Sequence, residues 1–338
     1  MGVPARVSLG IDRAPCFTAA NRALYDESQS LVAEEDGVPV GFMDVGCMTC
    51  RCGGRSIRAA YVELAGVRGD RRGSACFVLL AQEAERVARA AGARLGIALV
   101  NANNRRLART VELRYQQMVW AEPITIACVV PLSLQGPDRR FSYRSAEPDD
   151  AESVAKLVEE HRFSSFLSNR IIPREDDRGA SPGTQSVLIA EDRARRPVAT
   201  LGVWDQSEFR RARVLSLDRP THAAAGGVRI LSRLVGVPPL PSPGEDLRVV
   251  YATGVACKPG CETALGGLIR IVLASLRRTR HHLLLVGVPE HDRSRGALTG
   301  LLRVTNVNVP ALMPLDPGMT ESLARLRSPR AWLEYALT

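Results

Sequence analysis

The order of secondary-structure patterns along this chain occurs twice, and that repeat limits the possible folds more than any single motif does. In the first half, hydrophobic periodicity and turn residues predict a strand hairpin at 30–45, a strand at 58–67, a helix at 74–91 and a strand at 95–100. In the second half, the same signals predict a hairpin at 187–205, a strand at 248–255, a helix at 262–278 and a strand at 282–288. Two homologous units of strands and helices are the simplest account.

The segment 131–142 reads as the connection between the two units. It loses hydrophobic periodicity and gathers proline, glycine and charge. We therefore expect domains at 1–135 and 141–338, which suits 338 residues at roughly 150 residues per domain. Spacing between matched patterns indicates an insertion at 206–247 in the second unit, including the proline-rich VGVPPLPSPGED, and a shortened start in the first.

Composition points to a globular protein without a nucleic-acid partner. The chain is 45% hydrophobic and 24% charged, with a formal net charge of +9. Aromatic residues are only 5%, and Lys156 and Lys258 are the only lysines, so the basic charge is arginine scattered along the chain. A nucleic-acid-binding protein would show a basic stripe interleaved with stacking aromatics. A DNA-binding regulator stays as a minor alternative, which salt-dependent DNA affinity would reveal.

The N-terminal residues and the cysteines predict a cytoplasmic protein without metal or disulfides. No apolar run has the length of a signal-peptide core or a membrane helix, so we expect no membrane partner. Eight cysteines are too dilute for a disulfide framework in this length. Cys47, Cys50 and Cys52 suggest zinc, but no fourth ligand is near, and Cys257 and Cys261 would have to come from the other unit. Reduced cysteines in a hairpin are the expected state.

The strand YVELAGV and the helix after it carry the clearest chemical signal. Gly69, Gly73 and the Ser74-Ala75 pair stand at the helix start, where free backbone N–H groups and the helix dipole favour an anion. Arg68, Arg71 and Arg72 add positive charge there. The segment lacks the Gly-Lys-Ser/Thr ending of an ATP-binding P-loop and the three-glycine spacing of a dinucleotide-binding fold. It predicts a phosphate-containing ligand, and a plain surface turn is the alternative.

These residues resemble the GNAT superfamily of acyl-CoA-dependent N-acyltransferases. Residues 70–75 (DRRGSA) stand for the family's phosphate loop, 101–104 (NANN) for its Asn-rich turn, and 115–120 (YQQMVW) for its closing pattern. Asp70 departs from the family's first arginine, and Val119-Trp120 replaces Gly-Phe. The resemblance covers residues 30–130 well and the second half by element order.

The resemblance implies an α/β (α+β) fold of two GNAT-like domains, each a mixed, mostly antiparallel, splayed sheet flanked by helices. The pantetheine arm of acyl-CoA would add to an open strand edge, with its pyrophosphate at the following helix. The implied cofactor-binding residues are Ala65, Gly66, Val67, Arg68, Arg71, Arg72, Gly73, Ser74, Ala75, Asn101 and Asn104, with Gly254 and Val255 in the second unit.

Candidate catalytic residues lie in both units. Strand alternation puts Glu63 on one face with Tyr61, which makes Glu63 a candidate base, and Tyr115 is a candidate acid for the leaving thiolate. A solvated strand carboxylate and a core tyrosine are the alternatives. In the second unit, matching the two Gly-Val pairs places Tyr251 at the position of Glu63. Glu290 and His291 follow the last predicted strand as a titrating pair or as plain surface loop.

The phosphate loop of the second unit is eroded, because Glu262 to Leu265 stand where arginine and glycine belong. We therefore expect acetyl-CoA in the first unit and the acceptor side in the second. The predicted activity is acyl transfer to a small-molecule amine by a monomer or weak homo-oligomer, and a non-catalytic acyl-CoA-binding or sensor protein is the alternative. The arginine-rich composition and two-unit length also resemble tandem GNAT proteins of clavulanic acid biosynthesis, which implies a role in β-lactam secondary metabolism.

Overall fold

The elements of the first half follow the predicted order. The computed structural model describes residues 7–13, 18–71, 75–133, 135–169, 185–217, 232, 236–239, 241–326 and 329–333. The first half contains β1 (Val7–Asp12), α1 (Ala19–Leu24), β2 (Glu27–Glu35), β3 (Val38–Cys52), β4 (Arg55–Val67), α2 (Cys76–Ala90), β5 (Leu95–Asn101), α3 (Arg105–Arg114), β6 (Val119–Trp120) and β7 (Ile124–Val129).

The second half repeats this order and adds short strands. It contains β8 (Ser142–Ser145), α4 (Ala151–Arg162), β9 (Leu167–Ser168), β10 (Gln185–Glu191), β11 (Pro197–Asp205), β12 (Arg211–Leu217), β13 (Asp246–Leu247), β14 (Val249–Cys257), α6 (Glu262–Thr279), β15 (Leu283–Pro289), β16 (Arg303–Pro314), α7 (Pro317–Ala324) and β17 (Ala331–Trp332). Each predicted helix and strand named above is present, with ends shifted by a few residues.

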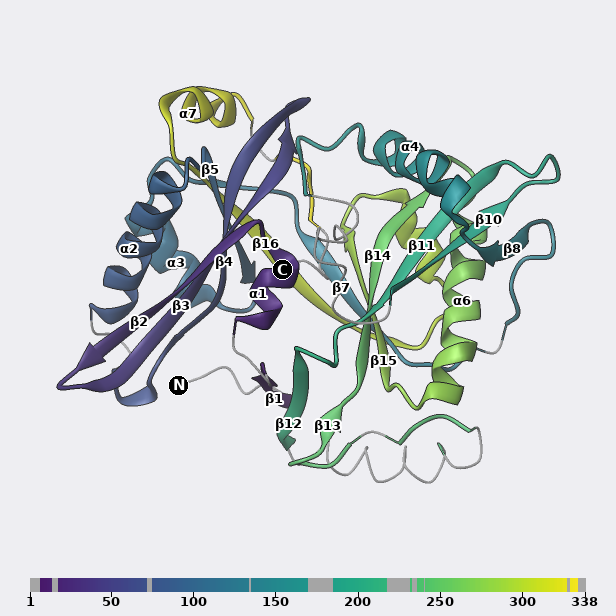
Figure 1. Cartoon of the computed structure of the whole chain (residues 1–338), viewed down its shortest axis with the longest axis horizontal. Coiled ribbons are helices and arrows are strands. Elements are labelled where there is room, and N and C mark those ends of the chain that lie inside the picture. The colour runs from purple at the N-terminus through teal and green to yellow at the C-terminus, as the bar shows by residue number, and fades with distance from the viewer. Residues whose placement is uncertain are drawn as a thin grey trace.

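Helical spacing of apolar residues fixes α2 against the sheet. Leu80, Ala84 and Ala88 recur on one face and pack on β2, β3 and β4 with the apolar side chains of that face. The helix ends at Ala90 and is followed by its C-cap Ala91 and by Gly92, which adopts a left-handed φ of 76°, a conformation that glycine tolerates without strain. The long helix α6 covers the second half of the sheet in the same way (Figure 1).

The main strands form one 14-stranded sheet in the order β17-β9-β3-β4-β5-β16-β7-β15-β14-β11-β10-β8, with β2 on β3 and β6 on β16. Most pairs are antiparallel, and β4·β5, β14·β15 and the short pair β17·β9 are parallel. Helices α2 and α6 flank opposite ends of the sheet in Figure 1. The predicted fold class, a mixed and mostly antiparallel sheet flanked by helices, is confirmed.

Exchanged strands join the two halves at the centre of the sheet. β16, from the second half, lies between β5 and β7 of the first half, and β7 pairs on its other side with β15. Figure 1 shows these strands crossing where the two halves meet. The halves therefore share one continuous sheet, while the predicted domain boundary near 135–141 stays a prediction.

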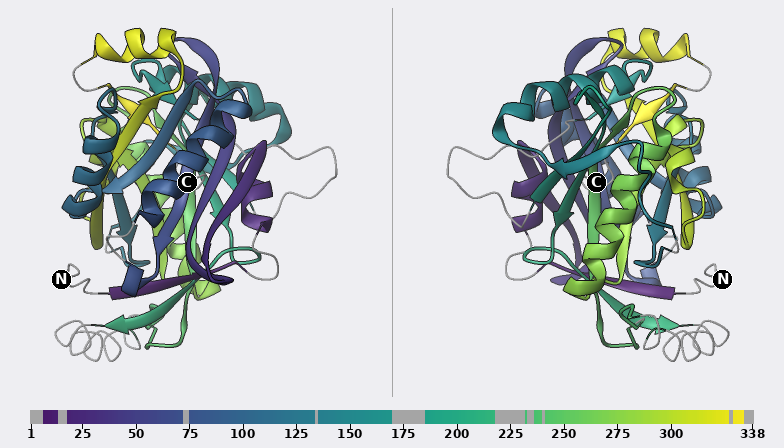
Figure 2. Two further views of the ribbon diagram at one scale, coloured as in Figure 1. Left: turned by 90° about the vertical axis from the view of Figure 1, so that its left-hand side faces the viewer. Right: turned by 90° about the vertical axis from the view of Figure 1, so that its right-hand side faces the viewer.

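A second, three-stranded sheet connects the chain start to the insertion of the second half. Its order is β1-β12-β13, and β1 pairs with β12 from Val7↔Leu217 to Asp12↔Arg211. Figure 2 shows this small sheet at one end of the molecule. The predicted insertion at 206–247 is thus partly strand, while 218–231, 233–235 and 240 lie outside the described residues. We call β1, β12 and β13 the clasp sheet.

Candidate functional site

Strands β4 and β5 separate part of the way along β4. Their parallel register ends at Val62↔Ala98, and β4 continues to Val67. Directly after this point Leu64 adopts a φ of 45°, and the pairing of β4 with β3 shifts register. A left-handed φ is strained for leucine, so the surrounding structure must hold the strand in this bulged conformation. The predicted splay therefore exists in the first unit.

The last residues of β4 turn backbone groups towards this gap. The N–H of Arg68 donates to the carbonyl of Val40 on β3, at 2.8 Å. Successive residues of a strand present their backbone groups to opposite sides, so the N–H and C=O of Val67 face away from β3. Ala65 is exposed, and Gly66 and Val67 are half-buried. We call Ala65–Val67 the β4 edge, and it has the geometry to accept an extended ligand as an added strand.

The second unit has the same bulge, which sets the correspondence between the units. The β14·β15 register ends at Tyr251↔Leu285, Gly254 has a φ of 54°, and the N–H of Lys258 donates to the Val198 carbonyl at 2.8 Å. Leu64 therefore matches Gly254, and Arg68 matches Lys258.

This correspondence corrects the sequence-based alignment of Tyr251 with Glu63. In the structure Tyr251 matches Tyr61, and Thr253 matches Glu63. The alignment failed because the two Gly-Val dipeptides sit at different distances from the bulge. The residues of β14 that match the β4 edge are Val255–Cys257, so the predicted Val255 belongs to this edge and the predicted Gly254 lies in the bulge before it.

In the second unit that edge is already occupied. Nδ1 of His161, at the end of α4, lies 3.0 Å from the carbonyl oxygen and 3.3 Å from the backbone nitrogen of Cys257. The imidazole also meets Trp332 edge-on, with ring centroids 4.9 Å apart. Val255, Ala256 and Cys257 are at most 1% exposed. The β14 edge is thus closed by side chains of the chain itself.

An aspartate fixes the closing histidine. Nε2 of His161 lies 3.2 Å from Oδ1 of Asp292, which also accepts hydrogen bonds from the backbone and side chain of Ser294. Burial pushes the pKa of Asp292 up, but the hydrogen bonds and charge of His161 and the Ser294 bonds outweigh it and leave that pKa lowered. We call His161, Asp292 and Trp332 the β14 plug.

Sequence reasoning missed the β14 plug and chose neighbouring residues instead. Glu290 is half-buried with a carboxylate 3.9 Å from Arg295, and His291 is exposed. The structure builds its His–carboxylate pair from His161 and Asp292, and not from the predicted pair. Asp292 directly follows the predicted residues, but no sequence signal links it to a helix end 131 positions earlier.

Glu63 lies in a buried polar cluster. It is 7% exposed, with Oε1 3.0 Å from Arg13 and 3.6 Å from Arg210. The Tyr25 hydroxyl donates to its Oε2 at 3.0 Å, and burial followed by the charge of Glu63 raises the pKa of Tyr25. The alternative of a solvated carboxylate is therefore wrong. The guanidinium of Arg210 also lies over the Tyr251 ring, 5.6 Å from its centroid, so Glu63 and Tyr251 meet around one arginine.

The clasp sheet delivers both arginines. Asp12 at the end of β1 pairs with Arg211 at the start of β12. The neighbouring residues Arg13 and Arg210 therefore lie side by side, just beyond the ends of these two strands. Across from Glu63 on β3 stands Asp44, also buried, and Arg13 lies 2.9 Å from its Oδ2. Two carboxylates directly opposite each other repel, and Arg13 between them offsets that repulsion.

Tyr115, Asn101 and Asn104 make hydrogen bonds within the fold. The Tyr115 hydroxyl donates to the Ala81 carbonyl of α2 at 3.4 Å, and burial, then the charge of Glu85, raises its pKa. Asn104 caps α3 by accepting from the Leu107 N–H at 3.2 Å. The Asn101 amide donates to Asn306 of β16 at 2.7 Å.

The predicted phosphate loop is only partly described. Residues 69–71 form a short 3₁₀ turn. Two ion pairs hold it, one between Arg68 and Asp70 at 2.7 Å and one between Arg71 and Glu35 of β2 at 2.5 Å. Ala75 caps the start of α2 without a side-chain hydrogen bond. Arg72, Gly73 and Ser74 lie outside the described residues, so the pyrophosphate contacts stay a prediction.

The cysteines of the first hairpin are buried thiols. Burial raises the pKa of Cys50 to about 12 and that of Cys52 to about 11, so both thiols are protonated at neutral pH. In the described part of the chain, no group of three or more His, Cys, Asp or Glu side chains is arranged to hold a metal ion. Among the same residues, no helix has the length and apolar character needed to cross a membrane.

Sequence comparisons find no matching family model and no matching curated protein. Among solved structures, the chain is similar to Saccharomyces cerevisiae N-myristoyltransferase with bound myristoyl-CoA, with a TM-score of 0.52 and 10% identity over 83% of this chain and 68% of that chain. A second structure of the yeast enzyme with myristoyl-CoA gives 0.51 and 10% over 82% and 64%. A GCN5-related N-acetyltransferase from Anabaena variabilis gives 0.46 and 10% over 85% and 63%. At such identity the likeness shows the fold alone.

Proposed function

We propose that this chain is an acyl-CoA-dependent N-acyltransferase that holds acetyl-CoA along the β4 edge. The observation that carries the proposal is the contrast between the exposed β4 edge and its closed counterpart on β14. The myristoyltransferase structures of the same fold contain myristoyl-CoA, which supports acyl-CoA as the ligand class. The GNAT resemblance of residues 70–75 favours the same unit.

The transfer step would use backbone groups of the β4 edge. The acceptor amine attacks the thioester carbon, a C–N bond forms, the C–S bond breaks, and CoA leaves as a thiolate. The amine loses one proton and the thiolate gains one. The Val67 N–H faces the gap and can hydrogen-bond the pantetheine arm or the oxyanion that develops on the thioester oxygen. Tyr115, kept protonated by burial, is the proposed donor to the thiolate.

The acceptor would approach across the face that carries Glu63 and Tyr251. Tyr251 belongs to the apolar and aromatic cluster between the two halves, and Arg210 contacts both Tyr251 and Glu63. The ion pairs with Arg13 and Arg210 hold the Glu63 carboxylate in place, so we assign it a positioning role and let water accept the amine proton. In this proposal the second half supplies the acceptor wall and does not bind a second acetyl-CoA.

A second candidate function is acyl-CoA binding without transfer. Its support is the same pairing of Glu63, which leaves the predicted base engaged with two guanidinium groups. For the enzyme, the acceptor class is a small-molecule amine. Composition and two-unit length favour a role in secondary metabolism of the clavulanic acid type, which a panel of β-lactam amine intermediates would test.

Native mass spectrometry of the full chain with acetyl-CoA, followed by thiol-release assays with an amine panel, tests both candidates. We expect one acetyl-CoA per chain and amine-dependent release of free CoA. Binding without any amine-dependent release would support the sensor function. Two bound molecules per chain, or none, would contradict placement on the β4 edge. The variant Glu63→Gln distinguishes the two possible roles of this residue. If Glu63 is a positioning group, the substitution changes kcat or KM and leaves the pH-dependence of kcat in place. If Glu63 is the general base, the substitution removes that pH-dependence.

A further inference from the structure

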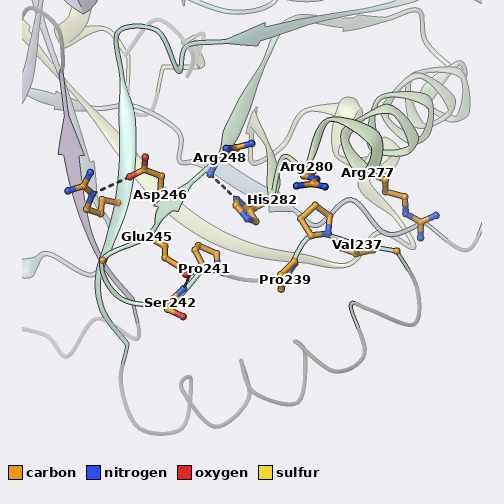
Figure 3. A pocket seen from close by; sticks show the side chains of 14 residues that line it. Val237, Pro239, Pro241, Ser242, Glu245, Asp246, Arg248, Arg277, Arg280 and His282 are labelled. Carbon is orange, nitrogen blue, oxygen red and sulfur yellow. Dashed lines mark hydrogen bonds and ion pairs between the residues drawn. The ribbon is translucent and has the colours of Figure 1, made fainter.

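A basic pocket lies in the second half, outside the site described above. Its volume is about 860 Å³, and it opens between the proline-rich segment 236–246 and the ends of β14, β15 and α6 (Figure 3). This volume is in the range of small-molecule sites, which run from about 300 to 1,000 Å³. Four arginines and two carboxylates line it, so the wall carries net positive charge.

The two carboxylates of the pocket are committed to local contacts. Asp246 pairs with Arg213 across the clasp sheet at 3.1 Å, and Glu245 accepts a hydrogen bond from the Ser242 N–H at 2.6 Å. Arg277 donates to the carbonyl of Pro131 at 3.0 Å. Among the described residues, no carboxylate lies within ion-pair distance of the guanidinium of Arg248 or Arg280. Within the described part of the chain, these two arginine charges are therefore available to a ligand.

His282 adds a hydrogen-bond donor beside these arginines. Its ring Nδ1 accepts the backbone N–H of Arg248 at 2.9 Å, and the backbone N–H of His282 donates to the Arg248 carbonyl at 2.8 Å. With Nδ1 accepting, the neutral ring carries its proton on Nε2. Burial, followed by the charges of Arg248 and His281, lowers the pKa of His282, while the backbone hydrogen bond with Arg248 and the charge of Glu245 act in the other direction.

The opposite wall is apolar and stiff. Val237 and Pro241 are buried, Pro238 is half-buried, and Pro239 is exposed at the rim, where prolines restrict the backbone. Figure 3 shows Pro239, Pro241 and Val237 facing the cluster of Arg248, Arg280 and His282. A wall of cations opposite a wall of prolines suits a molecule with one anionic end and an apolar body.

We propose that this pocket binds a small anionic molecule, whose phosphate or carboxylate group is held by Arg248, Arg280 and His282 while its apolar part lies on the prolines. The site does not depend on acyl transfer at the β4 edge. Phosphate and carboxylate share the chemistry that two guanidinium groups recognise, so separate probes must distinguish them.

Calorimetric titration of the full chain with pyrophosphate and, separately, with citrate tests the proposal. The test variant combines Arg248→Gln with Arg280→Asn, because Arg280 has a φ of 59° that asparagine tolerates. The control is Arg278→Gln, an exposed arginine of the same helix end that does not line the pocket. We expect at least one probe to bind the wild type and to lose tenfold or more in affinity in the double variant, with less than a twofold change in the control.

The identity of the stronger probe tells which anion the site takes. On binding, the pKa of His282, followed by its ring NMR signals, should rise because the anion offsets the arginine charges. Failure of both probes to bind, or an equal loss in the control, would overturn the proposal. Acetyl-CoA affinity, measured on the same variants, should not change. A parallel loss would assign these arginines to the acyl-CoA site and would overturn a separate anion site, whereas failure of the β4 proposal leaves this test intact.

Discussion

The β4 edge and the β14 edge are built alike and finished differently. Both strands leave their parallel neighbour after a few pairs, both contain a bulge with a left-handed residue, and both direct a backbone N–H and C=O into the gap. On β14 the Nδ1 of His161 lies within hydrogen-bond distance of both groups, whereas Ala65 on β4 stays exposed. The difference teaches that an open strand edge can be closed from inside the chain, by a side chain that lies against the backbone groups of that edge.

The largest effect should come from opening the β14 edge. His161→Ala removes the ring that contacts the Cys257 backbone and leaves Asp292 without its partner, so the free energy of unfolding should fall by about 3 kcal/mol. Urea denaturation measures this change. The control Phe163→Ala alters a side chain that is 77% exposed and should stay within about 0.5 kcal/mol. Equal small losses would mean that the β14 plug does not hold the edge closed.

A smaller effect is expected at the cluster beside the β4 edge. Glu63→Gln leaves Arg13 and Arg210 without this carboxylate and should lower the free energy of unfolding by about 2 kcal/mol. Glu34→Gln, at an exposed position of β2, is the matched control with no expected change. A stability equal to wild type would show that the arginines do not depend on Glu63.

The open edge itself is tested by removing one hydrogen-bond donor. Val67→Pro deletes the N–H that faces the gap and spares the ladder to β3, so acetyl-CoA affinity should fall about tenfold, which corresponds to about 1.4 kcal/mol. Val67→Ala keeps the N–H and should bind within about twofold of wild type. Equal affinity in all three proteins, by calorimetry, would place acetyl-CoA elsewhere.

The smallest expected effect is on the free energy of unfolding at low pH. The folded pKa of Asp292 is lowered, so its ionised form stabilises the fold above the unfolded value near 4. That contribution disappears as the pH falls from about 4 through the folded pKa, because protonation removes the charge. The stability difference between wild type and Asp292→Asn should therefore be constant at neutral pH and shrink below about pH 4. A difference that grows in acid would contradict the ion pair with His161.

Local patterns predicted the elements well because each depends on neighbours in the chain. The alternation of β4 and the helical spacing of Leu80, Ala84 and Ala88 are properties of a few successive residues. The repeat of element order then indicated two units, and the structure has the predicted order in both. Strand alternation also placed Glu63 on one face with Tyr61, and both side chains are buried in the structure.

Partnerships between distant segments were not readable. The alternation of apolar and polar residues in β16 does not predict that this strand pairs with β5 of the other half. Such alternation fixes which face of a strand is buried, and it does not fix which strand lies beside it. The clasp sheet, which brings Arg13 and Arg210 to Glu63, joins residues about 200 positions apart. The alignment of Tyr251 with Glu63 failed for a related reason, since a bulge changes phase without leaving a mark in composition.

The sequence alone determined the order of the α/β elements, which repeats in the two halves, and it predicted a phosphate-bearing ligand at a strand and helix of the first half. Only the tertiary structure decided that the first edge is open and the second is closed. The physical reason is that an edge is closed by whatever side chain reaches it. His161, Asp292 and Trp332 come to Cys257 from three segments that meet only when the sheet has formed.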